Sequence, residues 1–197
     1  MPTNRSARIQ RRTSETDIDL ELSLDGTGES SVETGVGFFD HMLGAFARHG
    51  LFDIKLQCRG DLEVDAHHTV EDIGICLGQA INDAVGTKQG INRFGASYVP
   101  MDEALARSVV DLSGRPFLSF HADLQREIIG VYPAALTIEF FRSLADNAKM
   151  TLHIDLLRGD NAHHCVEAIF KAVARSLRQA VEHDPRVSGV PSTKGVL

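Results

Sequence analysis

The stretch that decides the fold reads His67-His68-Thr69-Val70-Glu71, and it returns as His163-His164-Cys165-Val166-Glu167. The two copies begin 96 positions apart in a chain of 197 residues, so each half of the chain contains one copy. Each copy opens a segment whose apolar residues recur at the spacing of a helix. A histidine–glutamate motif at the start of one helix in each half indicates an internally duplicated protein.

The residues around the two motifs repeat as well. The segment FFDHML…LFDIKLQCRGD, within residues 38–61, aligns with IEFFRSL…MTLHIDLLRGD, within residues 138–160. Apolar spacing in both halves predicts the order strand, strand, helix, strand, helix, with extra strands. Two repeats of this size favour an α+β fold with two pseudo-symmetric halves. We place the first half at residues 1–94, the second at 95–184, and a tail rich in Gly, Pro, Ser and Val at 185–197.

The individual elements follow from local patterns, because alternating apolar residues predict strands and apolar residues three or four apart predict helices. In the first half the predicted strands are 16–24, 31–34 and 52–58, and the predicted helices are 38–49 and 67–85. In the second half the predicted strands are 95–101, 105–112, 116–124 and 151–157, and the predicted helices are 138–145 and 163–181. The turn-forming stretch 111–116 is interpreted as a hairpin between two of these strands.

Composition limits the class of protein. Apolar residues make up 43% of the chain and charged residues 24%, which is typical of a globular protein with a sizeable core. The net charge of −7 argues against nucleic acid as the main partner. The scattered cysteines Cys58, Cys76 and Cys165 predict small buried side chains rather than disulfides. With no signal-peptide core and no apolar run of about 18 residues, we expect a cytoplasmic protein with no membrane partner.

The two motifs carry the ligand chemistry of a metal site. Imidazole and carboxylate together suit Mn, Fe, Co, Ni or Zn. On a helix, Glu71 lies beside His67 or His68, because residues three and four apart share a face, and Glu167 lies beside one histidine of its own motif. Adjacent histidines diverge by about 100° around a helix, so we expect each histidine of a pair to serve a different ion.

The repeat suggests two further ligands. His41 lies in the predicted helix that precedes a strand in the first half, and the offset of 98 between the two corresponding helices places Glu139 opposite it. Imidazole and carboxylate both bind hard or borderline cations, so the exchange is chemically acceptable. His121 and His153 fall in strand-like segments and are interpreted as non-ligands. His49 is interpreted as a helix-end residue favoured by the helix dipole.

The basic residues that cluster near the N-terminus are interpreted as a solvated arm, because runs of like charge are usually solvated. They are Arg5, Arg8, Arg11 and Arg12.

Six segments spread along the chain match one family of enzymes. They read RxTxET (Arg11–Thr16), GxGFFDHML (Gly35–Leu43), DAHHTVEDIGI (Asp65–Ile75), DLSGRP (Asp111–Pro116), NAHHCVEAIFKA (Asn161–Ala172) and PSTKG (Pro191–Gly195). On these motifs the chain resembles the imidazoleglycerol-phosphate dehydratase family over essentially its whole length.

The resemblance implies a fold, a metal content and an assembly. Each half would be a four-stranded sheet with helices on one face, and each active site would hold two Mn(II) ions. Trimers would build a homo-oligomer of 24 subunits, with the active sites at subunit contacts. The eighth ligand position, commonly a histidine in the family, is Glu139 in this chain. The other implied ligands are His41, His67, His68, Glu71, His163, His164 and Glu167.

The implied activity is dehydration of D-erythro-imidazole-glycerol phosphate to imidazole-acetol phosphate and water, a step of histidine biosynthesis. Metals on both ring nitrogens would favour an imidazolate, which expels the neighbouring hydroxyl through a diazafulvene-like intermediate. Glu15 matches a substrate-site glutamate and is the candidate for proton transfer, a role that Glu71 and Glu167 could share. The residues implied for the phosphate are Arg93, Arg115, Lys171, Ser192, Thr193 and Lys194, which supply cations and hydroxyl donors.

Two other readings use the same clusters. A dinuclear-metal hydrolase would attack a phosphate ester with a metal-bound hydroxide and would release phosphate. A non-enzymatic metal-binding shell would show no turnover and would not need Glu15.

Overall fold

The computed structural model describes residues 5–124 and 127–197, and it has the α+β fold with two similar halves that the sequence predicts. In chain order the elements are β1 (Ser6–Arg12), β2 (Thr16–Ser23), β3 (Ser30–Glu33), α1 (Gly37–Gly50), β4 (Asp53–Gly60), α2 (His67–Val85), β5 (Phe94–Met101), β6 (Ala104–Asp111), β7 (Phe117–His121), β8 (Ile128–Ile129), β9 (Tyr132–Pro133), α3 (Leu136–Asn147), β10 (Thr151–Arg158) and α4 (Ala162–Val181).

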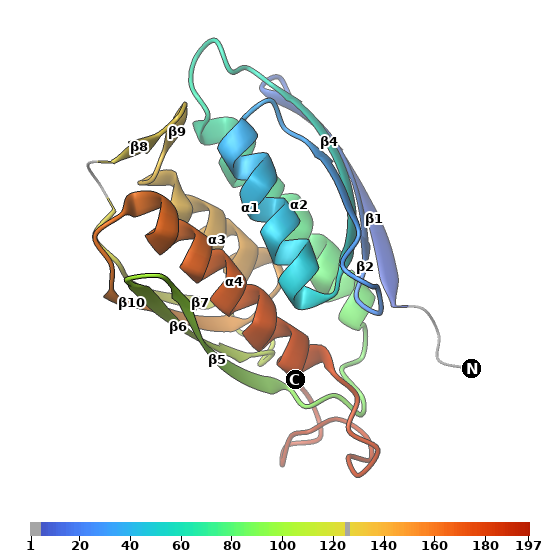
Figure 1. The fold of residues 1–197 in the computed structure, drawn as a ribbon. Coiled ribbons are helices and arrows are strands. Elements are labelled where there is room, and N and C mark those ends of the chain that lie inside the picture. The colour runs from blue at the N-terminus through green and yellow to red at the C-terminus, as the bar shows by residue number, and fades with distance from the viewer. Residues whose placement is uncertain (1–4, 125–126) are drawn as a thin grey trace.

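Two four-stranded sheets enclose the helices, as Figure 1 shows. The first sheet has the strand order β1-β2-β4-β3, and the second has the order β5-β6-β10-β7. Helices α1 and α2 cover the inner face of the first sheet, and α3 and α4 cover that of the second. Between the two layers of helices, α2 packs against α3 and α1 packs against α4. The apolar core therefore runs from one sheet through the helices to the other.

The duplication is visible in the register of the strands. Arg11 in β1 faces Ile18 in β2, and 88 positions later Val99 in β5 faces Ala106 in β6. Strand β3 runs parallel to β4, and β7 runs parallel to β10 in the same way. All four helices begin toward the upper left in Figure 1 and end toward the lower right. The first turns of the four helices consequently gather at one end of the molecule.

The interpretation of residues 111–116 as a hairpin is wrong. Strand β7 pairs with β10, in parallel, and β6 pairs with β5 and β10. The segment is instead a crossing from one side of β10 to the other, with Gly114 at φ 76°. A glycine suits this backbone conformation because a left-handed residue with a Cβ is strained.

The interpretation of the N-terminal arginines as a solvated arm is also wrong. Strand β1 is an edge strand that pairs with β2 along its whole length. Arg8 donates to Asp19 on the neighbouring strand, and Arg11 forms an ion pair with the buried Asp72 of α2. Cross-strand pairs of opposite charge stabilise an antiparallel sheet, so the positive charges of this segment are compatible with a strand.

A short hairpin, β8–β9, has no counterpart in the first half. The chain runs from the end of β3 at Glu33 to the start of α1 at Gly37, whereas the second half inserts residues between His121 and Leu136. Tyr132 of this insertion is fully buried, while Ile128 and Val131 at its tip are exposed. The sequence pattern did not indicate the hairpin because its strands are only two residues long.

Close contact between α2 and α3 depends on two glycines. A Cβ on Gly74 would lie 2.7 Å from the carbonyl oxygen of Phe140, and a Cβ on Gly78 would lie 2.7 Å from that of Leu144. Side chains at these positions would push the helices apart and disturb a densely packed core. The glycines thus fix the distance between the halves.

The three cysteines are buried and free, as the sequence predicts. Burial raises the pKa of Cys58 to about 12 and that of Cys76 to about 11, so both thiols stay protonated. They act as small apolar side chains in the core.

One buried ion pair distinguishes the halves. Asp72 is 6% exposed and accepts bonds from Arg11 and from the hydroxyl of Thr16. The positions that correspond in the second half are Val99, Ala168 and Ala104, all buried. The same architecture therefore holds either a polar cluster or an apolar one at this place.

Removing only one partner of this cluster should be costly. Asp72→Ala should lower the free energy of unfolding by about 2–3 kcal/mol, somewhat less than for a fully buried pair because the Arg11 side chain is 30% exposed. The double variant Arg11→Val/Asp72→Ala installs two of the three residues of the second half, removes both charges and should recover most of the loss. Chemical denaturation measures both values, and a double variant as unstable as Asp72→Ala would contradict the expectation.

Candidate metal centre

The first turn of α4 is fixed by its cap. The side chain of Asn161 accepts hydrogen bonds from the backbone N–H groups of His163 and His164, at 2.9 and 3.3 Å. Asparagine is among the preferred residues at this position because it satisfies N–H groups that lack a partner in the helix. The cap holds the backbone of both histidines in place.

One histidine from the first half meets the motif of the second half. Ligand atoms of His41, His163 and Glu167 all lie within 4.8 Å of one another. The Nε2 atoms of His41 and His163 are 3.7 and 3.2 Å from Oε2 of Glu167. Among the described residues, this is the one group of three candidate ligands whose donor atoms come together within a single chain. Two imidazoles and a carboxylate suit a divalent transition metal, so the donor set fits the implied ion.

Aromatic side chains pack against His163 of the cluster. The ring of Phe38 lies 5.0 Å from that of His163 and 5.3 Å from that of Tyr132. Tyr132 belongs to β9, so the hairpin inserted in the second half packs against the site. Packing of this kind restricts the rotamers of the ligands.

The carboxylate of Glu167 is 6% exposed and ionised. Burial alone would raise its pKa, but the ammonium of Lys171, 2.5 Å away, and the two histidines outweigh burial and lower the pKa below its usual value. Lys171 therefore lies at the cluster and neutralises it.

In the group related to it by the pseudo-symmetry, the carboxylate of Glu71 is more exposed than that of Glu167. Nε2 of His67 is 3.8 Å from Oε2 of Glu71, and both side chains are more than 40% exposed. Glu139, the counterpart of His41, lies in the first turn of α3 and forms an ion pair with Arg142 of the same helix. All eight predicted ligands thus lie in or near the first turns of the four helices, at one end of the molecule.

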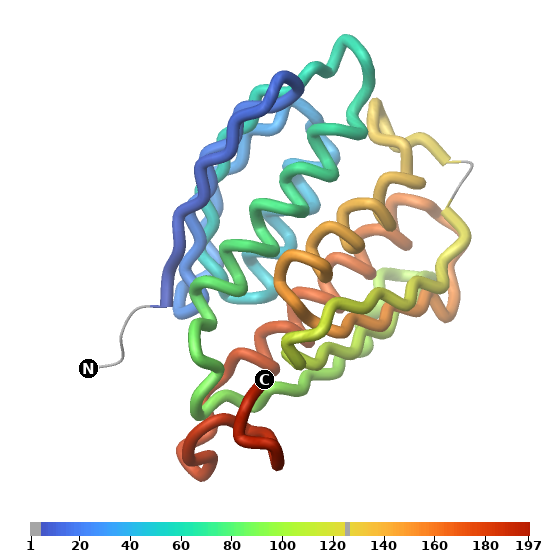
Figure 2. Tube along the Cα trace, turned by 180° about the vertical axis from the view of Figure 1, so that it is seen from behind, coloured from blue at the N-terminus to red at the C-terminus, as the bar shows by residue number. Residues whose placement is uncertain are grey.

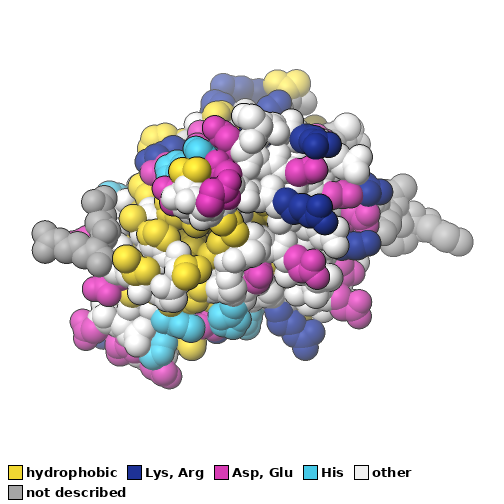
Figure 3. Space-filling model, turned by 90° about the horizontal axis from the view of Figure 1, so that it is seen from above, with side chains coloured by type: hydrophobic (Ala, Val, Ile, Leu, Met, Phe, Trp, Pro, Cys, Tyr) yellow, Lys and Arg dark blue, Asp and Glu magenta, His cyan; other side chains and the backbone are white. Residues whose placement is uncertain are grey.

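The second histidine of each motif points away from the first. The ring centroids of His67 and His68 are 6.1 Å apart and nearly perpendicular, and the same holds for His163 and His164. That each histidine of a pair serves a different ion stays a prediction. Figure 3, a view from above, shows histidine and acidic side chains beside hydrophobic ones on this face.

Carboxylates from loops contact these second histidines. Nδ1 of His68 lies 3.0 Å from Asp61, and its Nε2 lies 3.8 Å from Glu15. Nδ1 of His164 lies 2.8 Å from Glu103. Hydrogen bonds from His164 and from the backbone of Asn161 lower the pKa of Glu103 to about 2. The sequence analysis missed Asp61 and Glu103, although Glu103 stands 88 positions after Glu15, at the offset of the strands beside it.

An open cavity extends from the cluster along α1. Its lining includes His41, Arg48, His49, Glu167 and Lys171. His49 lies in the last turn of α1, as the sequence predicts, and burial, together with Lys171 and Arg175, lowers its pKa. A larger hollow of about 550 Å³ lies on the outer face of the first sheet and contains no histidine. The cavity beside the cluster combines small side chains, cations and ligand groups.

The residues predicted to bind phosphate divide into two groups. Lys171 belongs to the cluster, as described above, whereas Arg93 lies at the other end of α4. The guanidinium of Arg93 donates to Asp111 and to the carbonyl of Pro191 in the tail, and its backbone N–H donates to Ala180. The other members of this distant group are Arg115, Ser192, Thr193 and Lys194.

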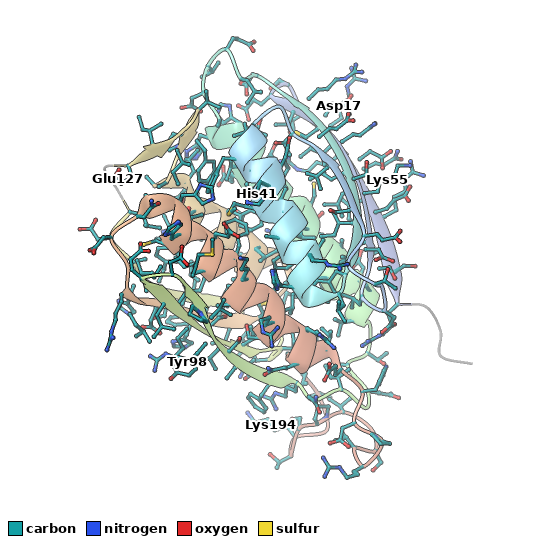
Figure 4. All side chains as sticks on the ribbon, viewed as in Figure 1. Asp17, His41, Lys55, Tyr98, Glu127 and Lys194 are labelled. Carbon is teal, nitrogen blue, oxygen red and sulfur yellow. The ribbon has the colours of Figure 1, made fainter. Side chains whose placement is uncertain are left out.

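The two groups are far apart in one chain. Ala180 follows His163 by 17 positions on one straight helix, a distance of about 25 Å at 1.5 Å per residue. Figure 4 shows His41 and Lys194 well separated, and Figures 1 and 2 place the C-terminal segment beyond the end of α4. One small substrate cannot contact both groups of a single chain.

A duplicated α+β fold with a histidine–carboxylate cluster between its halves is typical of a metal-dependent enzyme. The family model "Imidazoleglycerol-phosphate dehydratase" matches residues 34–177. The chain belongs to the imidazoleglycerol-phosphate dehydratase family.

Relatives match over the full length. An imidazoleglycerol-phosphate dehydratase of Polaromonas sp. is 56% identical over 100% of this chain and 96% of the relative. That of Acetivibrio thermocellus is 55% identical over 98% and 100%. The crystal structure of the Staphylococcus aureus enzyme is 43% identical, has a TM-score of 0.83, and covers 91% of this chain and 99% of its own. The relatives favour neither the dinuclear-metal hydrolase nor the non-enzymatic metal-binding shell.

The cluster of His41, His163 and Glu167 predicts metal-dependent stability. Mn(II) at 100 times its dissociation constant should stabilise the metal-stripped protein by about 2.7 kcal/mol, the effect expected of a ligand that binds only the folded state. His163→Ala should lose most of this stabilisation, since a ligand is removed. His121→Ala, which changes an exposed histidine on β7, should retain it. Thermal unfolding with and without Mn(II) measures the effect, and equal stabilisation of both variants would speak against the cluster.

Proposed function

We propose that the chain dehydrates D-erythro-imidazole-glycerol phosphate to imidazole-acetol phosphate and water in histidine biosynthesis. The observation that carries the proposal is full-length identity of 55–56% to relatives named for this activity. The fold agrees with it, because the residues of both motifs lie together at one end of the helices.

The metal is proposed to be Mn(II), with two ions in each active site. The ligands would be His41, His67, His68, Glu71, Glu139, His163, His164 and Glu167. The imidazole and carboxylate donors of this set support the proposal, although the same donors also suit other divalent ions. When bound, the metals would supply Lewis acidity at the nitrogens of the substrate ring.

Glu15 is the proposed group for proton transfer and also contacts substrate. Its carboxylate is about half exposed, and it faces Nε2 of His68 from 3.8 Å without a short hydrogen bond to it. Glu167 is less suited to move a proton, because its ion pair with Lys171 holds it ionised. Glu71 is exposed and faces His67, so it is the second candidate.

The separation of the two groups of substrate residues supports an active site shared between copies of the chain. Arg93, Arg115 and the tail residues Ser192, Thr193 and Lys194 would hold the phosphate of a substrate whose ring lies at the cluster of a neighbouring copy. Lys171 would serve the substrate from the cluster's own chain. We propose a homo-oligomer, of 24 subunits built from trimers, in which the tail 185–197 completes the site of a neighbour.

The last part of the proposal concerns the location and the partners of the chain. Within the described residues, no helix is long and apolar enough to cross a membrane. We propose a cytoplasmic location and a small phosphorylated substrate as the partner, with no nucleic acid, in line with the net charge of −7.

Turnover should require metal and should conserve phosphate. Metal-stripped protein should form no ketone from imidazole-glycerol phosphate, and added Mn(II) should restore the reaction because the ring needs a Lewis acid. Ketone and free phosphate are measured in one assay. Phosphate release would favour the hydrolase, and no ketone under either condition would favour the non-enzymatic metal-binding shell.

A shared site predicts complementation between two inactive variants. His163→Ala damages the cluster, and Arg115→Ala removes an exposed cation of the distant group. Oligomers that mix the two in equal amounts should regain about a quarter of the parent activity, because one site in four then combines an intact cluster with an intact phosphate group from the neighbour.

Activity of the co-expressed, co-purified mixture measures this, with each variant alone as the control. A mixture as inactive as the separate variants would show that both groups act within one chain.

A further inference from the structure

Each motif's second histidine is held by a carboxylate that comes from a loop. Nδ1 of His68 contacts both carboxylate oxygens of Asp61, at 3.0 and 3.2 Å. Nδ1 of His164 contacts Oε2 of Glu103, at 2.8 Å. An ionised carboxylate only accepts hydrogen bonds, so the Nδ1 atoms are the donors and carry the protons.

The duplication makes Glu103 the counterpart of Glu15. Both residues directly precede the second strand of their sheet, β2 or β6, at an offset of 88. Their side chains have taken different positions. Glu15 is on the Nε2 side of His68 and about half exposed, whereas Glu103 lies on the Nδ1 side of His164. In the first half the place at Nδ1 is taken by Asp61 instead.

Glu103 is also tied to the start of α4. Its other oxygen, Oε1, accepts the backbone N–H of Asn161 at 2.9 Å, and Asn161 caps the helix. The carboxylate therefore accepts from two fixed donors, one on each oxygen. This arrangement sets the rotation of the His164 ring relative to the helix.

We propose that Glu103 is a positioning residue that holds His164 in the Nδ1–H tautomer and directs its Nε2 lone pair to a metal ion. The inference rests on the proposed metal centre and names no new ligand. Histidines that bind metals commonly donate their other N–H to a carboxylate, which fixes the tautomer and the ring orientation. Asp61 has the same role for His68. Glu103 thus differs from its counterpart Glu15, which lies on the Nε2 side of His68.

Glu103→Gln tests this role by exchanging one acceptor for a donor. An amide offers one carbonyl oxygen, while Asn161 N–H and His164 Nδ1–H both require an acceptor. If the amide nitrogen faces His164, the ring must move its proton to Nε2, the atom that would bind the metal. The substitution therefore opposes metal binding while it keeps the size of the side chain.

The experiment titrates metal-stripped, oligomeric protein with Mn(II) alone and follows the free ion by electron paramagnetic resonance. Glu103→Gln should lower the affinity for one of the two Mn(II) ions by about 10–100-fold, the usual effect of losing such a partner. Asp61→Asn should lower the affinity for one Mn(II) ion by a similar factor. The matched control is Glu182→Gln, which removes an exposed carboxylate paired with Arg178 at the opposite end of α4 and should leave both affinities unchanged.

A second readout does not involve metal. In ¹⁵N spectra of metal-stripped protein with labelled histidine, Glu103→Gln should convert the signal of one residue from the Nδ1–H to the Nε2–H form. Parent-like Mn(II) affinity in Glu103→Gln would overturn the proposal. So would a weaker affinity without a change of tautomer, or with a fall in thermal stability that Glu182→Gln shares. A parent protein that binds no Mn(II) would instead overturn the metal centre on which the inference rests.

Discussion

A buried carboxylate at the contact between the halves is the constraint on which the site depends. Glu167, from the second half, must be compensated because an unpaired buried charge is strongly unfavourable. Lys171 on its own helix and His163 provide part of this compensation, and His41 from the first half provides the rest. The cluster therefore forms only when α1 packs correctly against α4. The apolar core secures that packing, and the close contact of α2 with α3 at Gly74 and Gly78 sets the distance between the halves, so the geometry of the site follows from the dimensions of the core.

Duplication supplied the site with two similar sets of residues, which have since diverged. The strand registers still agree residue by residue, yet a buried ion pair in one half corresponds to Val99 and Ala168 in the other. Such exchanges are tolerated because neither solution leaves a buried polar group unpaired. At the end of the molecule that holds the candidate ligands, the divergence changes which carboxylates contact the histidines. Glu15 and Glu103 occupy equivalent places in the chain. Glu15 lies near Nε2 of His68, whereas Glu103 contacts Nδ1 of His164.

Much of this could be predicted from the sequence, because helices with a long apolar stripe and the repeated motifs carry strong local signals. The helices and most strands lie where their periodicity predicts them. The repeat also predicts His41 as a ligand. Three features had no such signal. Strand β1 was hidden by arginines that pair across the sheet, and the partner of β7 is a strand far along the chain. The contact of Glu103 with His164 joins residues 61 positions apart, so only the three-dimensional structure reveals it.

The length of α4 links the chemistry to assembly. A helix buried along one side and packed on a sheet is rigid, so the distance of about 25 Å between its two ends cannot be closed by a local hinge. The cluster lies at its first turn, and Arg93 is fixed at its last turn by a backbone hydrogen bond and by Asp111. A small phosphorylated substrate spans far less than this distance. If both ends act on one substrate molecule, they must come from different copies, and the closed symmetry of a homo-oligomer would then repeat the same contact at every site.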